Sequence, residues 1–371
     1  MRVVIAAAGT AGHINPGIAI ANKIKREEKG SKIIFIGTTR GLENDLVPRA
    51  GYELKTINAY GLSKKISIEN IKKMCKTIKG YGEAKKIISE FKPDIVIGTG
   101  GYICGATISS AHNLKIPTLL HESNAFPGMA IKMLANKTNT ILVSFRDAIP
   151  RIKNCKNVVF TGTPVKIKKK DFNENERNKI IQTTGLNNKK PIILVFGGSQ
   201  GARAINQTLL DIIKNKKNSN YQIIWAAGPS QFDVIKEKLA DENIDINNID
   251  KVKIVPYIYN MEEIMNACDL IIARSGAMTL AEIALAGKPA IFIPLPSKSA
   301  NRQEDNARVF EKAGAAKVIL NQDLNSKILS DVIEDVISNK DNLIDMGNRA
   351  KNMAIYNVED KIYEEILKCC K

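Results

Sequence analysis

The first apolar segment of the chain reads Arg2-Val3-Val4-Ile5-Ala6-Ala7-Ala8 and continues as Gly9-Thr10-Ala11-Gly12-His13. A continuous apolar run of this length is typical of a strand buried on both faces of a parallel sheet. The same layout of apolar run, glycine loop and helical pattern recurs at Ile95–Gly101, Ile192–Gly201 and Ile271–Gly276. These repeated corners predict βαβ units, the building blocks of parallel α/β sheets.

Short β-rich runs alternate with amphipathic stretches along the whole chain, which predicts an α/β fold. The predicted strands are Arg2–Ala7, Lys32–Ile36, Asp94–Ile97, Pro117–His121, Thr140–Val143, Ile192–Phe196, Gln222–Ala226, Val252–Val255, Leu270–Ala273 and Ala290–Ile293. Between Val143 and Ile192, the proline and charge run of Thr163–Lys170 is typical of an interdomain linker. The last stretch, from about Asp341, predicts helices.

The pattern predicts two Rossmann-like domains that face each other across a cleft, each a parallel sheet covered by helices. One domain would comprise residues 1–163 and a C-terminal helix of about 345–371, and the other residues 164–344. Ligands of open α/β sheets bind at the carboxyl ends of the strands, where the glycine loops lie. We therefore expect the active site in the cleft between the domains.

The amino-acid composition argues against several classes of protein. The 371 residues are 44% hydrophobic and only 5% aromatic, which argues against a protein that stacks single-stranded nucleic acid. No apolar run approaches the roughly 18–20 residues that span a bilayer, and the six cysteines have no metal-binding or disulfide spacing. These features predict a cytoplasmic protein.

The positive charge is concentrated in the first half of the chain. Residues 1–163 hold 25 basic and 11 acidic residues, a balance of +14, whereas the remainder holds 30 and 27, a balance of +3; together they give the net charge of +17. This asymmetry predicts an anionic partner on the N-terminal half, such as a membrane face, a nucleic acid or a phosphorylated substrate. The alternative is generic use of lysine for solubility.

The glycine loops are suited to binding anions, because a loop of small residues before a helix presents free N–H groups and a positive dipole end. The first loop does not match the dinucleotide fingerprint, and the sequence contains no P-loop. In Arg274–Glu282, Ser275 and Gly276 predict a helix entry whose first amides could cradle a diphosphate. Glu282 is placed to accept hydrogen bonds from a ribose diol, or it merely complements the helix dipole.

Several segments together resemble one family, the MurG family of bacterial peptidoglycan glycosyltransferases, GT-B-fold enzymes that add GlcNAc to lipid-linked MurNAc-pentapeptide. The segments occur in the family's order and span nearly the whole chain. They are Gly9–Gly17, Gly98–Tyr102, His121–Asn124, Phe196–Ala202, Arg274–Glu282 and Lys312–Ala316. The resemblance implies an inverting hexosyltransferase that moves GlcNAc from UDP-GlcNAc to the MurNAc 4-OH of lipid I, undecaprenyl-diphospho-MurNAc-pentapeptide. Its product would be lipid II, for peptidoglycan synthesis and hence cell-wall biogenesis, cell shape and division.

The resemblance also implies a donor site, mainly in the C-terminal domain. Ser199 would contact the diphosphate, the backbone of Ile258 the uracil, and Gln303 and Asn124 the sugar. Phosphate and ribose would bind Ala277, Met278, Thr279, Leu280, Ala281 and Glu282, with Glu282 on the ribose, while Thr10, Ala11 and Gly12 would close over the sugar. Gly100, Gly101 and Tyr102 would lie on the acceptor side. Two positions depart from the family: Ala11 adds a methyl group to a Gly-Gly loop, and Lys166 replaces an arginine.

Inverting transfer requires a base for the acceptor hydroxyl and stabilisation of the departing UDP. His13 follows the first glycine loop, and an imidazole is suited to general-base work at neutral pH. The alternative for His13 is a hydrogen bond to loop backbone, and we expect structural roles for His112 and His121. Because no two aspartates are two residues apart, we predict no metal clamp and no cofactor, and UDP departure would rely on helix-end amides and cations.

A lipid-linked acceptor requires a membrane surface. Within Ile66–Ile88 an apolar stripe at helical spacing is surrounded by lysines, the pattern of a basic amphipathic helix on an anionic membrane. The stripe comprises Ile68, Ile71, Met74, Cys75, Ile78 and Tyr81, and the lysines are Lys72, Lys73, Lys76, Lys79, Lys85 and Lys86. We predict a peripheral protein on the cytoplasmic face of the cell membrane. The alternative for this segment is an ordinary helix on its own sheet.

Three other functions remain open at this stage. A GT-B transferase with another acceptor would share the donor motifs, and a UDP-GlcNAc epimerase would share the architecture and nucleotide site. A nucleic-acid-binding protein would explain the charge but neither the glycine loops nor Glu282, so we predict no nucleic-acid partner.

Overall fold

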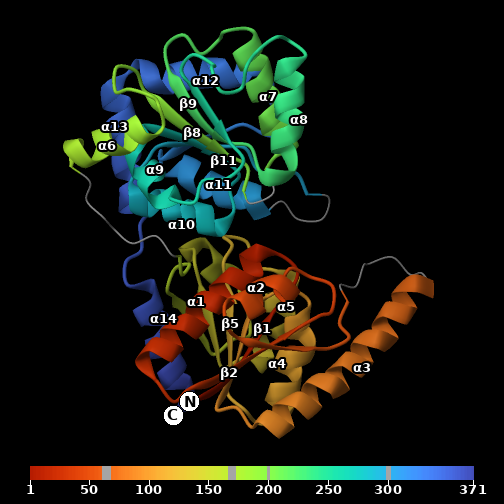
Figure 1. Ribbon diagram of the computed structural model, residues 1–371. Helices are drawn as coiled ribbons and strands as arrows, with labels where there is room; N and C mark the ends of the chain where they lie inside the picture. Colours follow the sequence, from red (N-terminus) through yellow and green to blue (C-terminus); the bar gives the residue numbers. More distant parts are fainter. Residues whose placement is uncertain (61–67, 166–172, 199–200, 298–301) are drawn as a thin grey trace. The chain divides into compact units, whose positions relative to one another are not determined.

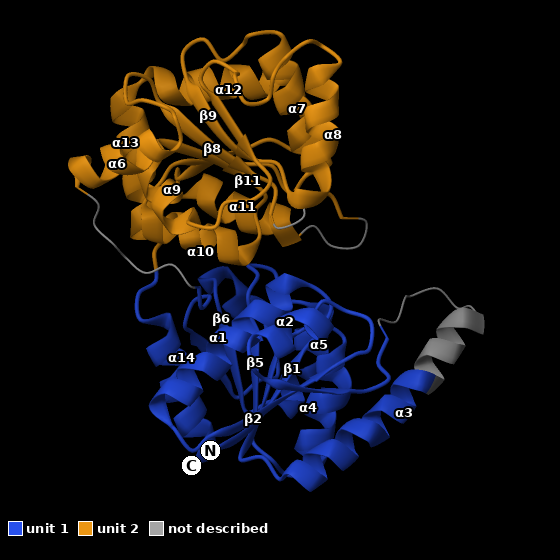
Figure 2. Ribbon diagram, in the orientation of Figure 1, with its two compact units in different colours: residues 1–166, 355–371 blue, residues 167–354 orange. Residues whose placement is uncertain are grey.

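The computed structural model describes residues 1–60, 68–165, 173–198, 201–297 and 302–371, with residues 68–75 described by their backbone alone. The chain forms two compact units (Figure 2): unit 1 is Met1–Lys166 with Ile355–Lys371, and unit 2 is Ile167–Ala354. The sequence placed these divisions at 163/164 and about 344/345. The later second division follows from α13 (Lys340–Asn352), whose Met346 is part of the core of unit 2.

Unit 1 is built on an entirely parallel sheet with the strand order β3-β2-β1-β4-β5-β6-β7 (Figure 1). The strands are β1 (Arg2–Ala7), β2 (Lys32–Gly37), β3 (Glu53–Thr56), β4 (Ile95–Gly100), β5 (Thr118–Glu122), β6 (Thr140–Val143) and β7 (Asn157–Phe160). The helices are α1 (Ala11–Glu27), α2 (Glu43–Arg49), α3 (Ile68–Phe91), α4 (Ile103–Asn113), α5 (Met129–Leu134) and α14 (Val358–Cys370), with 3-10 turns at Ala135–Lys137 and Arg146–Arg151.

Both faces of this sheet are buried, because successive side chains of a strand point to opposite faces. Val3 and Ile5 of β1 belong to a core shared with α1, α2 and α14, whereas Val4 and Ala6 belong to a core shared with α3, α4 and α5. The continuous apolar run of β1 is therefore the expected composition of a central parallel strand.

Unit 2 contains a second parallel sheet, with the order β10-β9-β8-β11-β12-β13. Its strands are β8 (Ile192–Phe196), β9 (Gln222–Ala226), β10 (Val252–Val255), β11 (Leu270–Ala273), β12 (Ala290–Phe292) and β13 (Ala316–Val318). Its helices, besides α13, are α6 (Glu174–Thr183), α7 (Arg203–Lys214), α8 (Pro229–Ala240), α9 (Met261–Ala267), α10 (Ala277–Ala286), α11 (Arg302–Lys312) and α12 (Ser326–Ser338).

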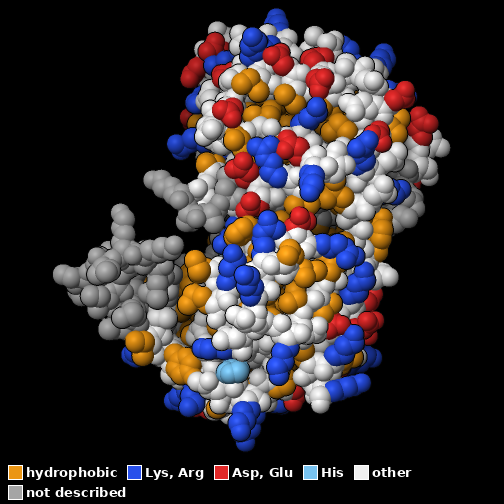
Figure 3. Space-filling view, turned by 180° about the vertical axis from the view of Figure 1, so that it is seen from behind, with side chains coloured by type: hydrophobic (Ala, Val, Ile, Leu, Met, Phe, Trp, Pro, Cys, Tyr) orange, Lys and Arg blue, Asp and Glu red, His pale blue; other side chains and the backbone are white. Residues whose placement is uncertain are grey.

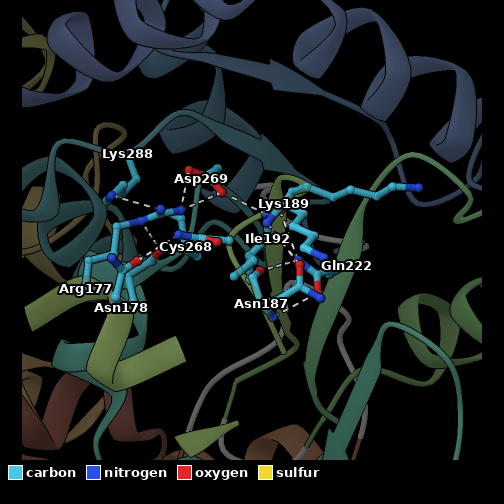
Figure 4. Close-up of polar contacts among 12 residues, drawn as sticks. Arg177, Asn178, Asn187, Lys189, Ile192, Gln222, Cys268, Asp269 and Lys288 are labelled. Atoms are coloured by element: carbon cyan, nitrogen blue, oxygen red, sulfur yellow. Dashed lines mark hydrogen bonds and ion pairs between the residues drawn. The ribbon is translucent and has the colours of Figure 1, made fainter. Parts of the chain in front are cut away.

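A polar network ties together the amino ends of β8 and β11 (Figure 4). Asp269 accepts hydrogen bonds from the backbone N–H of Ile192, at 2.8 Å, and from the guanidinium of Arg177, at 2.8 and 2.9 Å. Arg177 also donates to the carbonyl of Ala267 and so holds α6 against the sheet. This edge of the sheet is occupied by structural contacts, and the glycine loops lie at the opposite, carboxyl edge.

The C-terminal helix α14 returns to unit 1 and packs on α1. Ile362 and Ile366 are fully buried in the core of that face. At the rim, Lys23 pairs with Asp360 at 2.5 Å, and Arg26 pairs with Glu359. The last helix of the chain is thus an integral part of the first unit.

Candidate functional site

The first glycine loop lies next to the loop that follows β4, because β1 and β4 are paired strands. Thr10 is the N-cap of α1, Ala11 is its first residue, and Gly9 has φ +95°. After β4, Gly100 and Gly101 have φ of +123° and +83°, a region that glycine enters without steric cost. The structure thus brings the predicted donor loop and the predicted acceptor-side residues of unit 1 to one corner of the sheet.

His13 stands in the middle of this corner. Its ring packs so closely on Gly100 that a Cβ atom there would lie 2.5 Å from His13 Cδ2. The ring atom Nδ1 is 3.2 Å from the carbonyl oxygen of Ala8, and Thr99 Oγ1 donates to the His13 carbonyl at 2.7 Å. Because a carbonyl oxygen can only accept, a hydrogen bond at this contact requires a proton on Nδ1.

Glu43 is a residue that the sequence analysis missed. It begins α2, is fully buried, and accepts hydrogen bonds from the backbone N–H of Gly9 at 3.0 Å. Its other oxygen accepts from the N–H of Thr38 at 2.9 Å and from the Thr38 hydroxyl at 2.7 Å. Burial alone would raise the pKa of the Glu43 carboxyl, but the hydrogen bonds from Gly9 and Thr38 outweigh it and lower the pKa below its ordinary value.

Asn124 lies at the carboxyl end of β5, in a turn organised by Glu122. One oxygen of Glu122 accepts from the backbone N–H of Asn124 at 2.8 Å and from its side-chain amide at 2.9 Å, and the other accepts from the N–H of Gly128 at 2.6 Å. His121, before it, is fully buried, with Nε2 3.0 Å from the carbonyl of Gly162. Burial lowers the pKa of His121. His121 therefore has the surroundings of a structural residue.

In unit 2, β11 leads through Ser275 and Gly276 into α10. Gly276 is the N-cap, with extended backbone, so the first amides of α10 lie beyond it without a side-chain cap. The buried Ser275 hydroxyl donates to the carbonyl of Gln303 at 2.7 Å, and Asn306 donates to the carbonyl of Ser275 at 3.3 Å. The segment thus has the helix entry that the sequence predicts, held in place by α11.

Arg274 adds a half-buried cation beside this helix entry. Its Nη1 donates to the carbonyls of Ile293 and Pro294, at 2.9 Å each, and burial lowers the pKa of its guanidinium. Among the described residues its buried Nε has no hydrogen-bond partner. In the sequence, Arg274 is only the first residue of the Arg274–Glu282 motif, and nothing there assigns it a role.

The other residues predicted to bind the donor lie in unit 2 or outside the described residues. The residues from Ala277 to Glu282 occupy the first two turns of α10, and of these Leu280 is fully buried, whereas Ala277, Met278, Thr279, Ala281 and Glu282 are half-buried. Ile258 is buried after β10, and the Gln303 side chain accepts from the N–H of Leu295 at 3.0 Å. Ser199 and Lys166 lie outside the described residues.

Helix α3 presents apolar and basic side chains together. Ile78 is 65% exposed, and Lys76, Lys79, Lys85 and Lys86 are exposed around it, whereas the stripe and lysine positions before residue 76 lie outside the described side chains. Tyr81, by contrast, packs against the core of unit 1, as do Ala84 and Ile88. Figure 3 shows Lys and Arg side chains interspersed with hydrophobic ones on one face of unit 1.

The described residues contain neither a membrane-spanning helix nor a metal-binding cluster. No helix there is both long and apolar enough to cross a membrane. In the same part of the chain, no three His, Cys, Asp or Glu side chains are grouped so that they could hold a metal ion.

The two parallel sheets with their covering helices and glycine-loop corners define a two-domain α/β fold of the GT-B type. The glycosyltransferase family 28 N-terminal domain matches residues 3–143, and the family 28 C-terminal domain matches residues 192–362. A Thermoanaerobacter sp. (strain X514) protein named UDP-N-acetylglucosamine–N-acetylmuramyl-(pentapeptide) pyrophosphoryl-undecaprenol N-acetylglucosamine transferase is 42% identical over 366 residues, which is 99% of each chain. The chain therefore belongs to glycosyltransferase family 28 and, within it, to the MurG family of GlcNAc transferases.

Solved structures agree with this assignment. The crystal structure of Acinetobacter baumannii MurG matches with a TM-score of 0.79 and 27% identity over 99% of both chains. A UDP-GlcNAc 2-epimerase from Neisseria meningitidis, solved with UDP-GlcNAc bound, matches with a TM-score of 0.64 and 15% identity, over 99% of this chain and all of the other. The likeness to the epimerase is one of fold alone.

Proposed function

We propose that this protein transfers GlcNAc from UDP-GlcNAc to the MurNAc 4-OH of lipid I, with inversion, and so forms lipid II. The observation that supports this most is the full-length likeness to transferases named for this donor and acceptor. The glycine-loop corners of both units add to it, because they supply the base and the anion-binding amides that the reaction needs. Unit 1 would take the acceptor, and unit 2 would take most of the donor.

His13 is the group in unit 1 that we propose as general base. With its proton on Nδ1, held toward the Ala8 carbonyl, the ring offers Nε2 as a proton acceptor. Gly100 and Gly101 let the chain after β4 pass directly beside the ring, since any side chain at Gly100 would meet the imidazole. Tyr102, which precedes α4, would border the acceptor.

The departing UDP would be stabilised in unit 2. The amides at the start of α10, which have no side-chain cap, would bind the diphosphate, and Arg274 places a positive charge directly before them. Ser199 would also contact the diphosphate, the Ile258 backbone the uracil, and Glu282 the ribose. Asn124, Gln303 and the Thr10–Gly12 loop would contact the sugar, and Lys166 would supply charge at the linker. No metal ion is assigned a role.

We further propose that unit 1 binds the cytoplasmic face of the membrane, where a lipid-linked acceptor resides. The exposed Ile78 lies among lysines on α3, and α5 carries the exposed Met129 and Met133. Helix α4 packs against both α3 and α5, so these side chains belong to helices of one face of the sheet. Exposed apolar groups surrounded by cations are the features of a surface that binds anionic lipid.

The experiment that tests this function supplies the purified protein with labelled UDP-GlcNAc, with and without lipid I. We expect lipid-extractable label only when lipid I is present, and no C2 epimer of UDP-GlcNAc without it. Formation of the epimer would support the epimerase alternative. Bound UDP-GlcNAc without transfer to lipid I would indicate a GT-B transferase with another acceptor.

A further inference from the structure

One peptide group connects the buried Glu43 to His13. The N–H of Gly9 donates to the Glu43 carboxylate at 3.0 Å, and the carbonyl of Ala8, the other end of the same peptide, is 3.2 Å from His13 Nδ1. A trans peptide is planar, so its N–H and C=O point in opposite directions and cannot turn independently. The carboxylate that fixes the N–H therefore also fixes the direction of the carbonyl that meets the imidazole.

The carboxylate is suited to this role because it only accepts. Three donors converge on its two oxygens: the N–H of Gly9, and the N–H and hydroxyl of Thr38. A carboxamide of the same shape would turn its NH2 group toward one of the backbone N–H groups, whichever way it was placed. Hydrogen bonds in a chain also polarise one another, so a charged acceptor on the N–H strengthens the carbonyl as an acceptor.

The chain leaves room for this buried carboxylate. A Cβ atom at Gly41 would lie 2.0 Å from Glu43 Oε2, and one at Gly37 would lie 2.7 Å from Glu43 Cγ. On the far side of the peptide, a Cβ atom at Gly101 would lie 2.7 Å from the Ala8 oxygen. Glycines thus occupy the positions around the peptide where any side chain would displace the carboxylate or the carbonyl.

We propose that Glu43 is a positioning residue for His13, acting through the Ala8–Gly9 peptide to hold the imidazole with its proton on Nδ1 and its lone pair on Nε2. The inference rests on the proposed role of His13 as general base. The resulting order of carboxylate, imidazole and nucleophile is like that of hydrolases, except that a peptide group lies between the carboxylate and the imidazole.

The tautomer of His13 tests the proposal directly. Long-range 1H–15N NMR of the full-length protein at alkaline pH reports which ring nitrogen carries the proton, and a His13→Ala spectrum identifies the signals among the three histidines. We expect the Nδ1–H tautomer in the wild type and a mixture of tautomers in Glu43→Gln. A wild-type His13 protonated on Nε2 overturns the proposal whether or not Glu43→Gln folds.

Kinetics give the second test. We expect Glu43→Gln to lower kcat about 10- to 100-fold, a part of the roughly 10²–10⁴-fold that general-base catalysis contributes, with the KM for UDP-GlcNAc within about twofold of wild type. The matched control is Asp94→Asn, because Asp94 accepts from the backbone N–H of Arg2 at the other end of β1, at 2.7 Å. The control should keep wild-type kcat. An equal loss in both variants would mean that Glu43 only stabilises the strand.

The double variant separates this proposal from the function on which it rests. If Glu43 acts through His13, then adding Glu43→Gln to His13→Ala should change kcat by less than about threefold. If the kcat losses of the two single variants instead multiply in the double variant, then Glu43 does not act through His13, and His13 stays the base. A near-wild-type kcat for His13→Ala alone overturns the base assignment and the Glu43 proposal together.

Discussion

At the scale of single residues, the position of the His13 ring depends on the absence of a side chain at Gly100. Gly100 has φ +123°, and an added Cβ would lie 2.5 Å from the imidazole. We expect Gly100→Ala to lower the free energy of unfolding by about 1–3 kcal/mol, the range for strained backbone and overpacking. We also expect kcat to fall by at least about tenfold, because the ring must shift. Urea denaturation and a transfer assay measure the two effects.

Gly105 provides the matched control for this substitution. It lies inside α4, and an added Cβ would meet nothing within 4 Å. Replacing glycine by alanine in a helix stabilises it by about 0.5–1 kcal/mol, so Gly105→Ala should be slightly more stable than wild type, with unchanged kcat. Equal behaviour of the two variants would contradict the packing described for His13.

His121 gives the stability of unit 1 a dependence on pH. Burial lowers the pKa of His121 from its ordinary value of 6.5, and the neighbouring Glu122 and the Gly162 carbonyl only partly oppose burial. Unfolding thus takes up a proton below that value, so the free energy of unfolding should be constant above about pH 6.5 and fall below it. In His121→Gln this slope between pH 6.5 and 5 should disappear. A slope unchanged in the variant would assign it to other groups.

Sequence alone proposed His13 and predicted the α10 entry, whereas it gave no role to Glu43 or Arg274. His13 lies in the first turn of α1, after the loop that follows β1, and Ser275 lies two residues after β11, where pattern and chemistry coincide. Glu43 follows β2 within an ordinary acidic stretch, and only its burial and its contact with Gly9 distinguish it. Contacts between the ends of neighbouring strands depend on strand order, which a pattern of apolar runs does not contain.

At the scale of elements, the central strands and the edge strand β10 were predicted closely, and the other three edge strands were not. Arg2–Ala7, Thr140–Val143 and Leu270–Ala273, among others, have the predicted bounds. The sequence missed β3, β7 and β13, which are all edge strands of three or four residues. Edge strands are short and half-exposed, so they lack the continuous apolar run by which the buried strands were found.

Helix α3 carries the prediction that belongs to this scale. We expect Ile78→Asp to weaken binding of the protein to vesicles of anionic lipid by about tenfold, because it replaces an exposed apolar side chain among lysines by an acid. Ile344→Asp on α13 is the control, since Ile344 is similarly exposed, at 52%, but lies in unit 2. Flotation assays measure both. Equal loss in the two variants would contradict a membrane surface on α3.

At the scale of the whole molecule, the chain consists of two units with separate cores, and α14 belongs to the first of them. Ile366→Ala should therefore destabilise unit 1 by about 2–5 kcal/mol. In this variant unit 2 should keep its protection against hydrogen exchange. Ile333→Ala, in α12, should instead lower the protection of unit 2 and leave that of unit 1 unchanged, because both side chains are almost fully buried. Loss of protection in both units from Ile366→Ala would show that the units unfold together.

The roles proposed for both units depend on GlcNAc transfer with inversion to the MurNAc 4-OH of lipid I. NMR of the product formed from UDP-GlcNAc and undecaprenyl-diphospho-MurNAc-pentapeptide in excess chelator would identify the new bond. We expect a single new β-linkage at the MurNAc O4, at an undiminished rate. An α-linkage, a bond at another hydroxyl, or activity that returns only with a divalent metal would contradict the account.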